Sequence, residues 1–254
     1  MLNIHRIQKA VVSKVFNYTW GQSLTTTQIL QERRRRIKSV AILYSLQNCP
    51  FAMRARMALL MAKQDVLLRA IVTKDKPKEM LKISPKGTVP ILVLVDGRLI
   101  DESLEIMTWA LQKSDPEDLL YRKEPHLYPQ MLSLISVCDS GFRTNLSAYK
   151  YGNRYHQPNE IELRSSCEVF IKQLERLLQN NNFLFGDKLS IADLAILPNV
   201  RQFMNVDKKW FRGAYYPYLT NWLGNLMQSL LFSKAMRKYP LWNDNHEEFL
   251  LNWD

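Results

Sequence analysis

Cysteine, histidine and long apolar runs are all scarce in this sequence of 254 residues. Its three cysteines form no C-x-x-C pair, which excludes a disulfide scaffold and a zinc-thiolate site and favours a reducing compartment. The four histidines form no H-x-x-x-H pair, so we expect no metal. No uncharged apolar run approaches the roughly 18 residues that span a bilayer. We therefore expect a cytoplasmic protein without a transmembrane segment.

The composition is that of a folded protein, and its positive charge is concentrated at one end. Hydrophobic residues make up 46% of the chain and charged residues 23%, which is ordinary for a globular protein and excludes a disordered one. The formal charge is +11, but residues 1–38 hold eight Lys or Arg against one Glu, so the remainder carries only +4. We therefore expect no nucleic-acid-binding face on the fold itself.

Residues 1–38 form a basic N-terminal extension, which we expect to be poorly ordered. It contains six Ser or Thr and apolar residues at helical spacing between Ile4 and Val15, a pattern similar to an organelle transit peptide. The alternatives are a basic tail without a targeting role, or a start codon placed too early. Attachment to nucleic acid or to an anionic membrane through Arg33–Arg36 is a further alternative.

Residues 39–112 alternate between strand and helix patterns. Asp96-Gly97 between two apolar segments is a hairpin signal. Strands are predicted at 40–44, 66–72, 91–95 and 98–100, and helices at 50–63, 77–82 and 103–112. The connection rules assemble these elements into a mixed four-stranded sheet with helices packed on it, which is an α/β, thioredoxin-type layout.

The rest of the chain is predicted to be a polar linker followed by a second domain. Residues 113–124 are rich in acidic residues and contain a turn signal, which is typical of a linker. Residues 125–254 show only helical patterns, so we predict an all-helical domain. Its clearest feature is Ser190-Ile191-Ala192-Asp193, where Ser190 and Asp193 can form a capping box at a helix N-terminus.

Cys49 is the candidate nucleophile. It stands immediately before Pro50, which suits the first position of a helix, so its sulfur lies where free backbone N–H groups and the helix dipole favour an anion. Arg54 and Arg56 would add to this effect if they point toward the sulfur. Ala52 occupies the position of a second thiol, so redox chemistry here would use one thiol and an outside partner. The alternative is a buried structural cysteine, which we expect for Cys138 and Cys167.

Two further segments carry features of a ligand site. Val89-Pro90 precedes a strand; from the residues alone that peptide bond is expected to be trans, because only about 5 to 6% of X-Pro bonds in folded proteins are cis. Glu102-Ser103 begins the last helix of the α/β domain. Ser103 could cap that helix and hold a ligand carboxylate, while Glu102 could receive an ammonium group. The alternative is an ordinary helix cap beside a surface acid.

At these residues the chain resembles the glutathione transferase superfamily, in particular its cysteine-type members: omega-like transferases and the larger, transferase-shaped glutaredoxin. The resemblance runs from about Val40 to Trp242. It rests on Cys49-Pro50-Phe51-Ala52, Thr88-Val89-Pro90, Glu102-Ser103 and Ser190-Ile191-Ala192-Asp193.

The resemblance implies that glutathione is the cosubstrate, and it assigns a role to each candidate site residue. Cys49 would form a mixed disulfide with glutathione, in a thioltransferase or dehydroascorbate reductase-like activity, and no metal would take part. Val89 would pair with the cysteinyl main chain beside a cis Pro90. Glu102 and Ser103 would hold the γ-glutamyl end of glutathione, and Lys76 would pair with its glycyl carboxylate. Phe51 would line the pocket of the thiol.

Three further hypotheses concern the residues at the end of the first strand, the substrate pocket and a non-enzymatic function. Tyr44 and Ser45 stand where tyrosine-type transferases polarise a thiol, but strand packing accounts better for Tyr44. A substrate pocket between the domains would be walled by aromatic residues, for which the candidates are Tyr149, Tyr151, Tyr155, Trp210 and Phe211. The alternative to an enzyme is a non-enzymatic adaptor that uses the transferase fold to hold a protein partner. A homodimer is compatible with either function.

Overall fold

The computed structural model describes residues 40–253, which form one compact unit. The predictions for residues 1–38 lie outside this range. The α/β part contains β1 (Ala41–Leu46), α3 (Pro50–Met61), β2 (Val66–Ile71), α4 (Lys78–Ile83), β3 (Ile91–Val93), β4 (Leu99–Ile100) and α5 (Ser103–Lys113). This order confirms the predicted thioredoxin-like arrangement. The Asp96-Gly97 hairpin is present between β3 and β4, and Gly97 takes a positive φ of 84° there.

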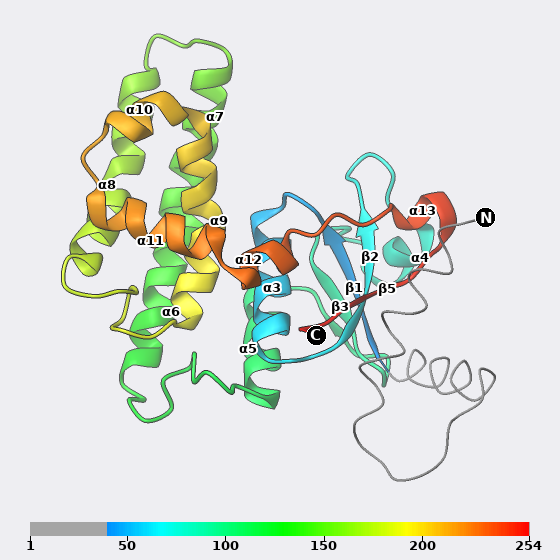
Figure 1. Ribbon diagram of the computed structural model, residues 1–254. Helices are drawn as coiled ribbons and strands as arrows, with labels where there is room; N and C mark the ends of the chain where they lie inside the picture. Colours follow the sequence, from blue (N-terminus) through cyan, green and yellow to red (C-terminus); the bar gives the residue numbers. More distant parts are fainter. Residues whose placement is uncertain (1–39, 254) are drawn as a thin grey trace, which may run out of the picture. The chain divides into compact units, whose positions relative to one another are not determined.

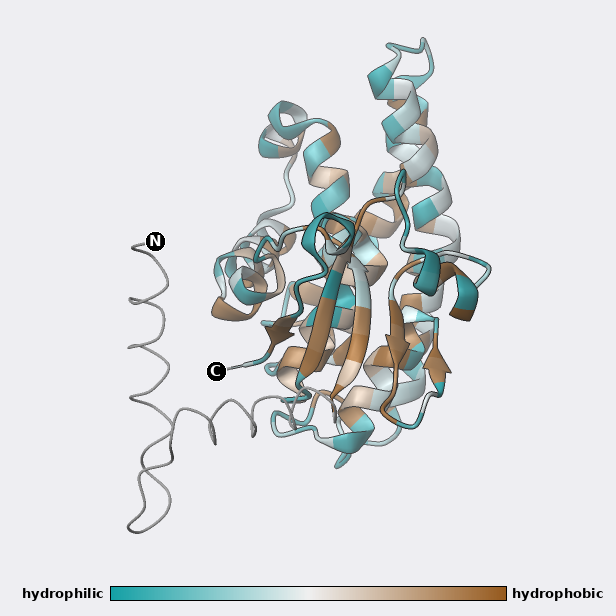
Figure 2. Ribbon diagram, turned by 90° about the vertical axis from the view of Figure 1, so that its right-hand side faces the viewer, coloured by the Kyte–Doolittle hydropathy of each residue, from teal (hydrophilic) through white to brown (hydrophobic). Residues whose placement is uncertain are grey.

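The strands form a mixed sheet in the order β4-β3-β1-β2-β5. Figure 1 labels β3, β1, β2 and β5 side by side. β1 pairs in parallel with β2 and antiparallel with β3, so β1 is central and is hydrogen-bonded on both sides. Its apolar residues are covered on both faces: Leu43 joins the large core under α3 and α5, and Tyr44 joins a small cluster with Met80 of α4 on the other face. Figure 2 shows the strands largely in the brown of hydrophobic residues.

The fifth strand corrects the prediction of an all-helical C-terminal segment. β5 (Phe249–Leu251) returns to the α/β part and pairs antiparallel with β2, at the far edge of the sheet. An ion pair of 2.8 Å between Arg69 and Glu248 holds the two segments together. The strand was missed because three residues cannot show a periodic pattern. It covers an edge of the sheet that would otherwise present unpaired backbone groups.

The second part is helical and is built around α9. Its helices are α6 (Leu127–Val137), the π-helix η1 (Cys138–Phe142), α7 (Arg143–Arg154), α8 (Glu160–Leu178), α9 (Ile191–Val206), α10 (Lys208–Gly213), α11 (Pro217–Gln228), α12 (Leu230–Ala235) and α13 (Trp242–Asn245). No helix within residues 40–253 is long and apolar enough to cross a membrane.

The predicted capping box starts α9. Ser190 Oγ accepts from the backbone N–H of Asp193, and the Asp193 carboxylate accepts from the backbone N–H of Ser190. That carboxylate also accepts from the indole N–H of Trp222 and from the backbone N–H of Leu184. Burial nevertheless raises the pKa of Asp193 above its usual range. The cap therefore joins α9 to α11 and to the preceding loop.

The polar segment between α5 and α6 is packed against the second part. Leu119 is fully buried, and its carbonyl accepts from the backbone N–H of Ile191 at the start of α9. The Asp115 carboxylate accepts from the N–H groups of Leu119 and Leu120. Its turns thus support α9 directly.

α3 connects the two parts. Residues Ala52 to Leu60 are all buried, because the sheet and α5 lie on one side of the helix and α9 and α12 on the other. The helix therefore has no exposed face over this stretch. It also buries two arginines, Arg54 and Arg56, whose hydrogen-bond partners come from several segments. These arginines bear directly on the site at the start of α3.

Candidate functional site

Cys49 lies at the N-cap of α3. Its backbone is extended, and Pro50 takes the first position of the helix, as predicted. Its side chain is half-buried, and the Sγ atom lies 3.7 Å from the carbonyl oxygen of Val89. No acidic residue occurs in the first turn of α3, so the positive end of the helix dipole is not neutralised there. Cys49 therefore lies at the helix N-terminus that the sequence predicted, beside the loop that precedes β3.

Arg56 adds positive charge near this sulfur. It is 2% exposed and donates to Ser45 Oγ and to the carbonyls of Leu46, Gln47 and Ala235. Burial lowers the pKa of Arg56 to about 10, and attraction to the Cys49 thiolate opposes that effect. Arg56 therefore ties the end of β1 to the end of α12.

The hydroxyl groups at the end of β1 are occupied inside the protein. The Tyr44 hydroxyl accepts from Arg69 at 2.7 Å, and Ser45 Oγ accepts from Arg56 at 2.5 Å. Both side chains are 2% exposed. This confirms strand packing as the account of Tyr44, and it leaves Cys49 as the accessible candidate nucleophile at this end of the sheet.

The loop before β3 lies beside the thiol. The Val89-Pro90 peptide bond is cis, which confirms what the family resemblance implied and corrects the expectation from the residues alone. The contact between Val89 and Cys49 brings together two residues that are 40 positions apart in sequence. These two candidate site residues therefore belong to one surface.

Glu102 and Ser103 lie at the start of α5, with one correction to the predicted cap. Glu102 is the N-cap residue and Ser103 is the first helical residue, and neither side chain caps the helix. The Glu102 carboxylate accepts from the Lys86 ammonium at 2.5 Å, and this hydrogen bond raises the pKa of Lys86. Both side chains are more than half exposed, so water screens the pair and a ligand ammonium could replace Lys86.

Arg54 supports Ser103 and was not predicted to do so. Its Nε–H donates to Ser103 Oγ at 3.0 Å, and its two terminal nitrogens donate to the Asp139 carboxylate at 2.9 and 2.8 Å. Ser103 is 3% exposed, and because its Oγ accepts this bond, Arg54 does not use the hydroxyl hydrogen of Ser103. Asp139 belongs to the π-helix η1, an irregularity often found at functional sites. The sequence signal for these contacts was the presence of two arginines in the otherwise apolar segment 50–61.

Lys76 lies in the turn before α4. Its side chain crosses Gly87: a Cβ at Gly87 would lie 3.4 Å from Lys76 Nζ and 3.0 Å from a Leu81 methyl group. Gly87 has a φ of 60°, so a side chain there would be strained as well as crowded. Gly87 thus lets Lys76 lie across the loop that leads to Val89.

Phe51 is half-buried between two cations. The guanidinium carbons of Arg54 and Arg143 lie 4.8 and 4.5 Å from the centre of its ring. These contacts connect the first turn of α3 to the start of α7. Phe51 is therefore positioned by both parts of the protein.

The five predicted aromatic wall residues divide into two groups. Tyr151 and Tyr155 are 56% and 58% exposed, and both line a cavity of about 700 Å³ that extends to Asn48, the residue before Cys49. Tyr149 and Phe211 are in the helical core, where they pack around Phe203 with half-buried Trp210. None of these three lines that cavity, because the helical periodicity turns their side chains inward.

Cys138 and Cys167 are buried in the helical part, as predicted. Burial raises the pKa of each thiol to about 12. They remain protonated at neutral pH and are poor nucleophiles.

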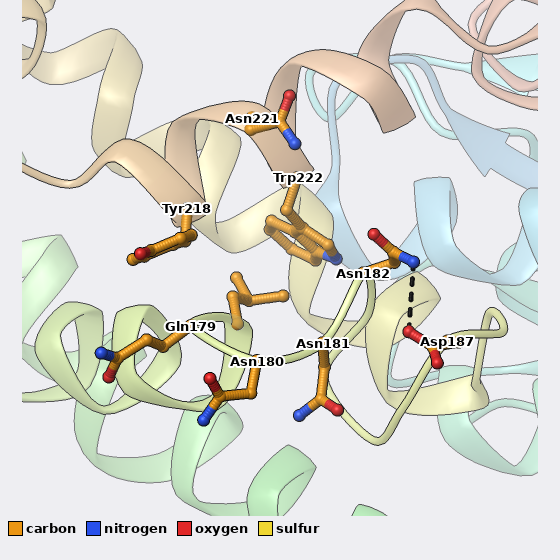
Figure 3. Close-up of a pocket in the computed structure, with 9 residues that line it drawn as sticks. Gln179, Asn180, Asn181, Asn182, Asp187, Tyr218, Asn221 and Trp222 are labelled. Carbon is orange, nitrogen blue, oxygen red and sulfur yellow. Dashed lines mark hydrogen bonds between the residues drawn. The ribbon is translucent and has the colours of Figure 1, made fainter.

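A second cavity, of about 380 Å³, lies at the C-terminal end of α8 (Figure 3). Its lining is mostly amide side chains, and Asn182 donates to Asp187 at 3.1 Å. Neither Cys49 nor any other cysteine lines it. Within residues 40–253, no group of three His, Cys, Asp or Glu side chains is placed to hold a metal ion.

A thioredoxin-like sheet followed by a helical bundle is the architecture of the glutathione transferase fold. Two family models match the chain: the glutathione S-transferase N-terminal domain over residues 43–118 and the glutathione S-transferase C-terminal domain over residues 162–225. The chain belongs to the glutathione S-transferase superfamily.

Named glutathione S-transferases and a solved structure are similar to the chain. The chain is 28% identical over 178 residues to the rice protein "Probable glutathione S-transferase DHAR1, cytosolic" (Oryza sativa subsp. japonica), which covers 70% of this chain and 77% of the relative. It is 27% identical over 206 residues to mouse (Mus musculus) glutathione S-transferase omega-1, and the match covers 77% of this chain and 82% of the mouse protein. Among solved structures, a glutathione transferase family member from Pseudomonas fluorescens with two glutathiones bound is similar, with a TM-score of 0.69 at 16% identity. The match covers 82% of this chain and 97% of that protein.

Proposed function

We propose that this protein is a glutathione-dependent thioltransferase that uses Cys49 as its single nucleophile. The observation that carries the proposal is the position of the half-buried Cys49 thiol. It lies at the N-terminus of α3, where no acidic side chain offsets the helix dipole, beside Val89 and close enough to Arg56 for an electrostatic interaction. Tyr44 and Ser45, the two hydroxyl residues at the end of β1, are buried and hydrogen-bonded inside the protein, which disfavours either as the group that activates a thiol. DHAR and omega transferases among the relatives support the same chemistry.

The reaction has two exchange steps. The Cys49 thiolate attacks the glutathionyl sulfur of a mixed disulfide R–S–S–glutathione; the S–S bond breaks, Cys49 is glutathionylated and R–S⁻ leaves and takes a proton from water. The thiolate of a second glutathione then attacks the glutathionyl sulfur held on Cys49. Glutathione disulfide leaves and the Cys49 thiolate is restored. Ala52 stands where a second protein thiol would be, so the outside glutathione must supply the second step.

Glutathione would be held along the surface from Lys76 to Ser103. Its γ-glutamyl carboxylate would accept from the Ser103 hydroxyl and from free backbone N–H groups of the first turn of α5, while its ammonium would replace Lys86 at Glu102. The cysteinyl main chain would pair with Val89 beside cis Pro90. Lys76 would pair with the glycyl carboxylate, and Phe51 would lie beside the thiol.

Cys49→Ser tests the proposal directly. We expect the variant to lose roughly a hundredfold or more of its turnover of a glutathione mixed disulfide, because a serine hydroxyl is not ionised at neutral pH. Cys167→Ala, which removes a buried thiol outside the site, is the matched control and should retain turnover. Full activity of Cys49→Ser would refute the mechanism.

Intact-mass measurement after treatment with glutathione disulfide gives a second test. One adduct is expected, on Cys49, since burial raises the pKa of Cys138 and Cys167 to about 12 and keeps both thiols protonated. Absence of an adduct, together with no binding to immobilised glutathione, would favour the non-enzymatic adaptor instead.

A further inference from the structure

The cavity beside Asn48 has a composition that limits what can occupy it. It measures about 700 Å³, and its lining comes from the last turns of α7, the turn after it, and α9, with Asn48 at the end next to Cys49. α7 and α9 pack against each other, so each helix forms one wall of the cavity. Asn48 brings the cavity to the residue that precedes the candidate nucleophile.

Three cations line this cavity, and none of its described lining residues is acidic. They are Lys150, Arg154 and Arg201, and within residues 40–253 none of the three makes an ion pair. Lys150 has only a 3.4 Å contact with the Gln202 amide oxygen. The nearby acid Glu160 accepts from Asn153 at 2.8 Å and does not line the cavity. The lining therefore carries three positive charges and no negative one.

Arg201 is the most informative of the three cations. Its Nε atom is buried without a hydrogen-bond partner in residues 40–253, while its guanidinium lies 5.6 Å from the centre of the Phe232 ring. A buried N–H donor without a partner is costly, and a ligand that accepts from it removes that cost. The group that best satisfies a guanidinium is a carboxylate or another planar oxyanion.

Tyr151 and Tyr155 supply an exposed aromatic wall to the same cavity. Their ring centres are 4.5 Å apart, and each side chain is more than half exposed. Aromatic rings left open to solvent beside a cation favour a ligand with a flat apolar body that can cover them.

We infer that the thiol partner R of the mixed disulfide is an aromatic anion, with its ring on Tyr151 and Tyr155 and its carboxylate among Lys150, Arg154 and Arg201. This inference rests on the proposed function, and it adds the class of substrate. The same cations also stabilise R–S⁻ as it leaves Cys49-bound glutathione, since a thiolate develops at the Asn48 end of a positive cavity.

Binding without turnover tests the inference independently of catalysis. In the Cys49→Ser background, titration calorimetry compares 2-naphthoate with 2-naphthamide, which has the same ring but no charge. We expect naphthoate to bind about tenfold more tightly, the size expected of three partly exposed charges, and the difference to shrink as salt is raised from about 50 mM to 0.5 M. Equal affinities at low salt would overturn the inference.

Charge removal at the cavity tests the residues. Lys150→Gln combined with Arg154→Gln should bring the two affinities to within about twofold of each other, because two of the three cations are lost. The matched control is Lys113→Gln with Lys123→Gln, which removes the same charge from exposed positions outside the cavity and should keep the tenfold preference. An equal loss in both double variants would show a general charge effect and refute the assignment.

Turnover then connects the cavity to the reaction. Glutathione mixed disulfides of 4-mercaptobenzoate and 4-mercaptobenzamide are compared, each enzymatic rate being divided by the uncatalysed rate with glutathione. The benzoate should have a kcat/KM about tenfold higher in the wild-type protein, and Lys150→Gln with Arg154→Gln should remove that advantage. Turnover of neither compound would refute the proposed function, while the calorimetry would still decide the inference.

Discussion

At the residue scale, the ion pair between Arg54 and Asp139 joins the candidate glutathione site to the helical part. The Arg54 side chain is 4% exposed and donates to both Asp139 oxygens and to Ser103 Oγ. Removing one partner of a buried pair leaves the other charge without compensation. Asp139 thus acts through Arg54 as a positioning residue for Ser103.

Asp139→Asn should lower the free energy of unfolding by about 2 kcal/mol, less than a fully buried pair because Asp139 is 26% exposed. The KM for glutathione should rise several-fold with little change in kcat, because Ser103 is displaced while Cys49 is untouched. Denaturant unfolding and steady-state kinetics measure the two effects. Asp96→Asn, in the exposed pair with Arg98, should change neither quantity. A fall in kcat alone would contradict the role of Asp139.

At the element scale, β5 is the feature that the periodic patterns did not predict. It covers the edge of β2 and brings Leu251, which is 2% exposed, into the main core. Leu250 points to the opposite face, since side chains alternate along a strand, and it is 44% exposed. Neighbouring leucines of one short strand therefore differ in their contribution to stability.

Leu251→Ala should lower the free energy of unfolding by about 2 to 3 kcal/mol through loss of buried volume in the core. Leu250→Ala is the matched control and should change it by less than about 0.5 kcal/mol. Denaturant unfolding of both variants measures the difference. Equal effects would mean that β5 does not pair with β2 in solution.

At the scale of the whole molecule, the two parts share one core through α3. This helix packs on α5 on one side and on α9 and α12 on the other, and Arg56 reaches the carbonyl of Ala235 in α12. A ligand that stabilises the start of α3 should consequently stabilise the helical part as well.

Reduced glutathione at a hundred times its dissociation constant should add about 2.7 kcal/mol of stability and raise the Tm by about 5 to 10 °C in a single transition. Thermal unfolding followed by circular dichroism and by tryptophan fluorescence measures it. Ser103→Ala should reduce the shift, whereas Ser166→Ala, at an exposed position in α8, should not. Two separate transitions, of which glutathione moves one, would refute the coupling.

The order of strands and helices and the start of α9 could be predicted from local sequence. The Asp96-Gly97 turn, Pro50 at the start of α3 and the Ser190-Asp193 capping box each depend on residues within a few positions of one another, so short-range geometry is sufficient to specify them. The candidate nucleophile, Cys49, was found for the same reason, because a helix N-terminus is a local structure.

Only the tertiary structure determined which distant segments form ion pairs and which side chains of a helix are buried. Arg54 meets Asp139 across 85 positions, and Arg69 meets Glu248 across 179. The separation of Tyr149 from Tyr151 into core and cavity wall depends on how α7 packs, which no residue of α7 specifies by itself. Such contacts follow from the burial of whole faces and from the pairing of charges that burial requires, and both depend on the complete fold.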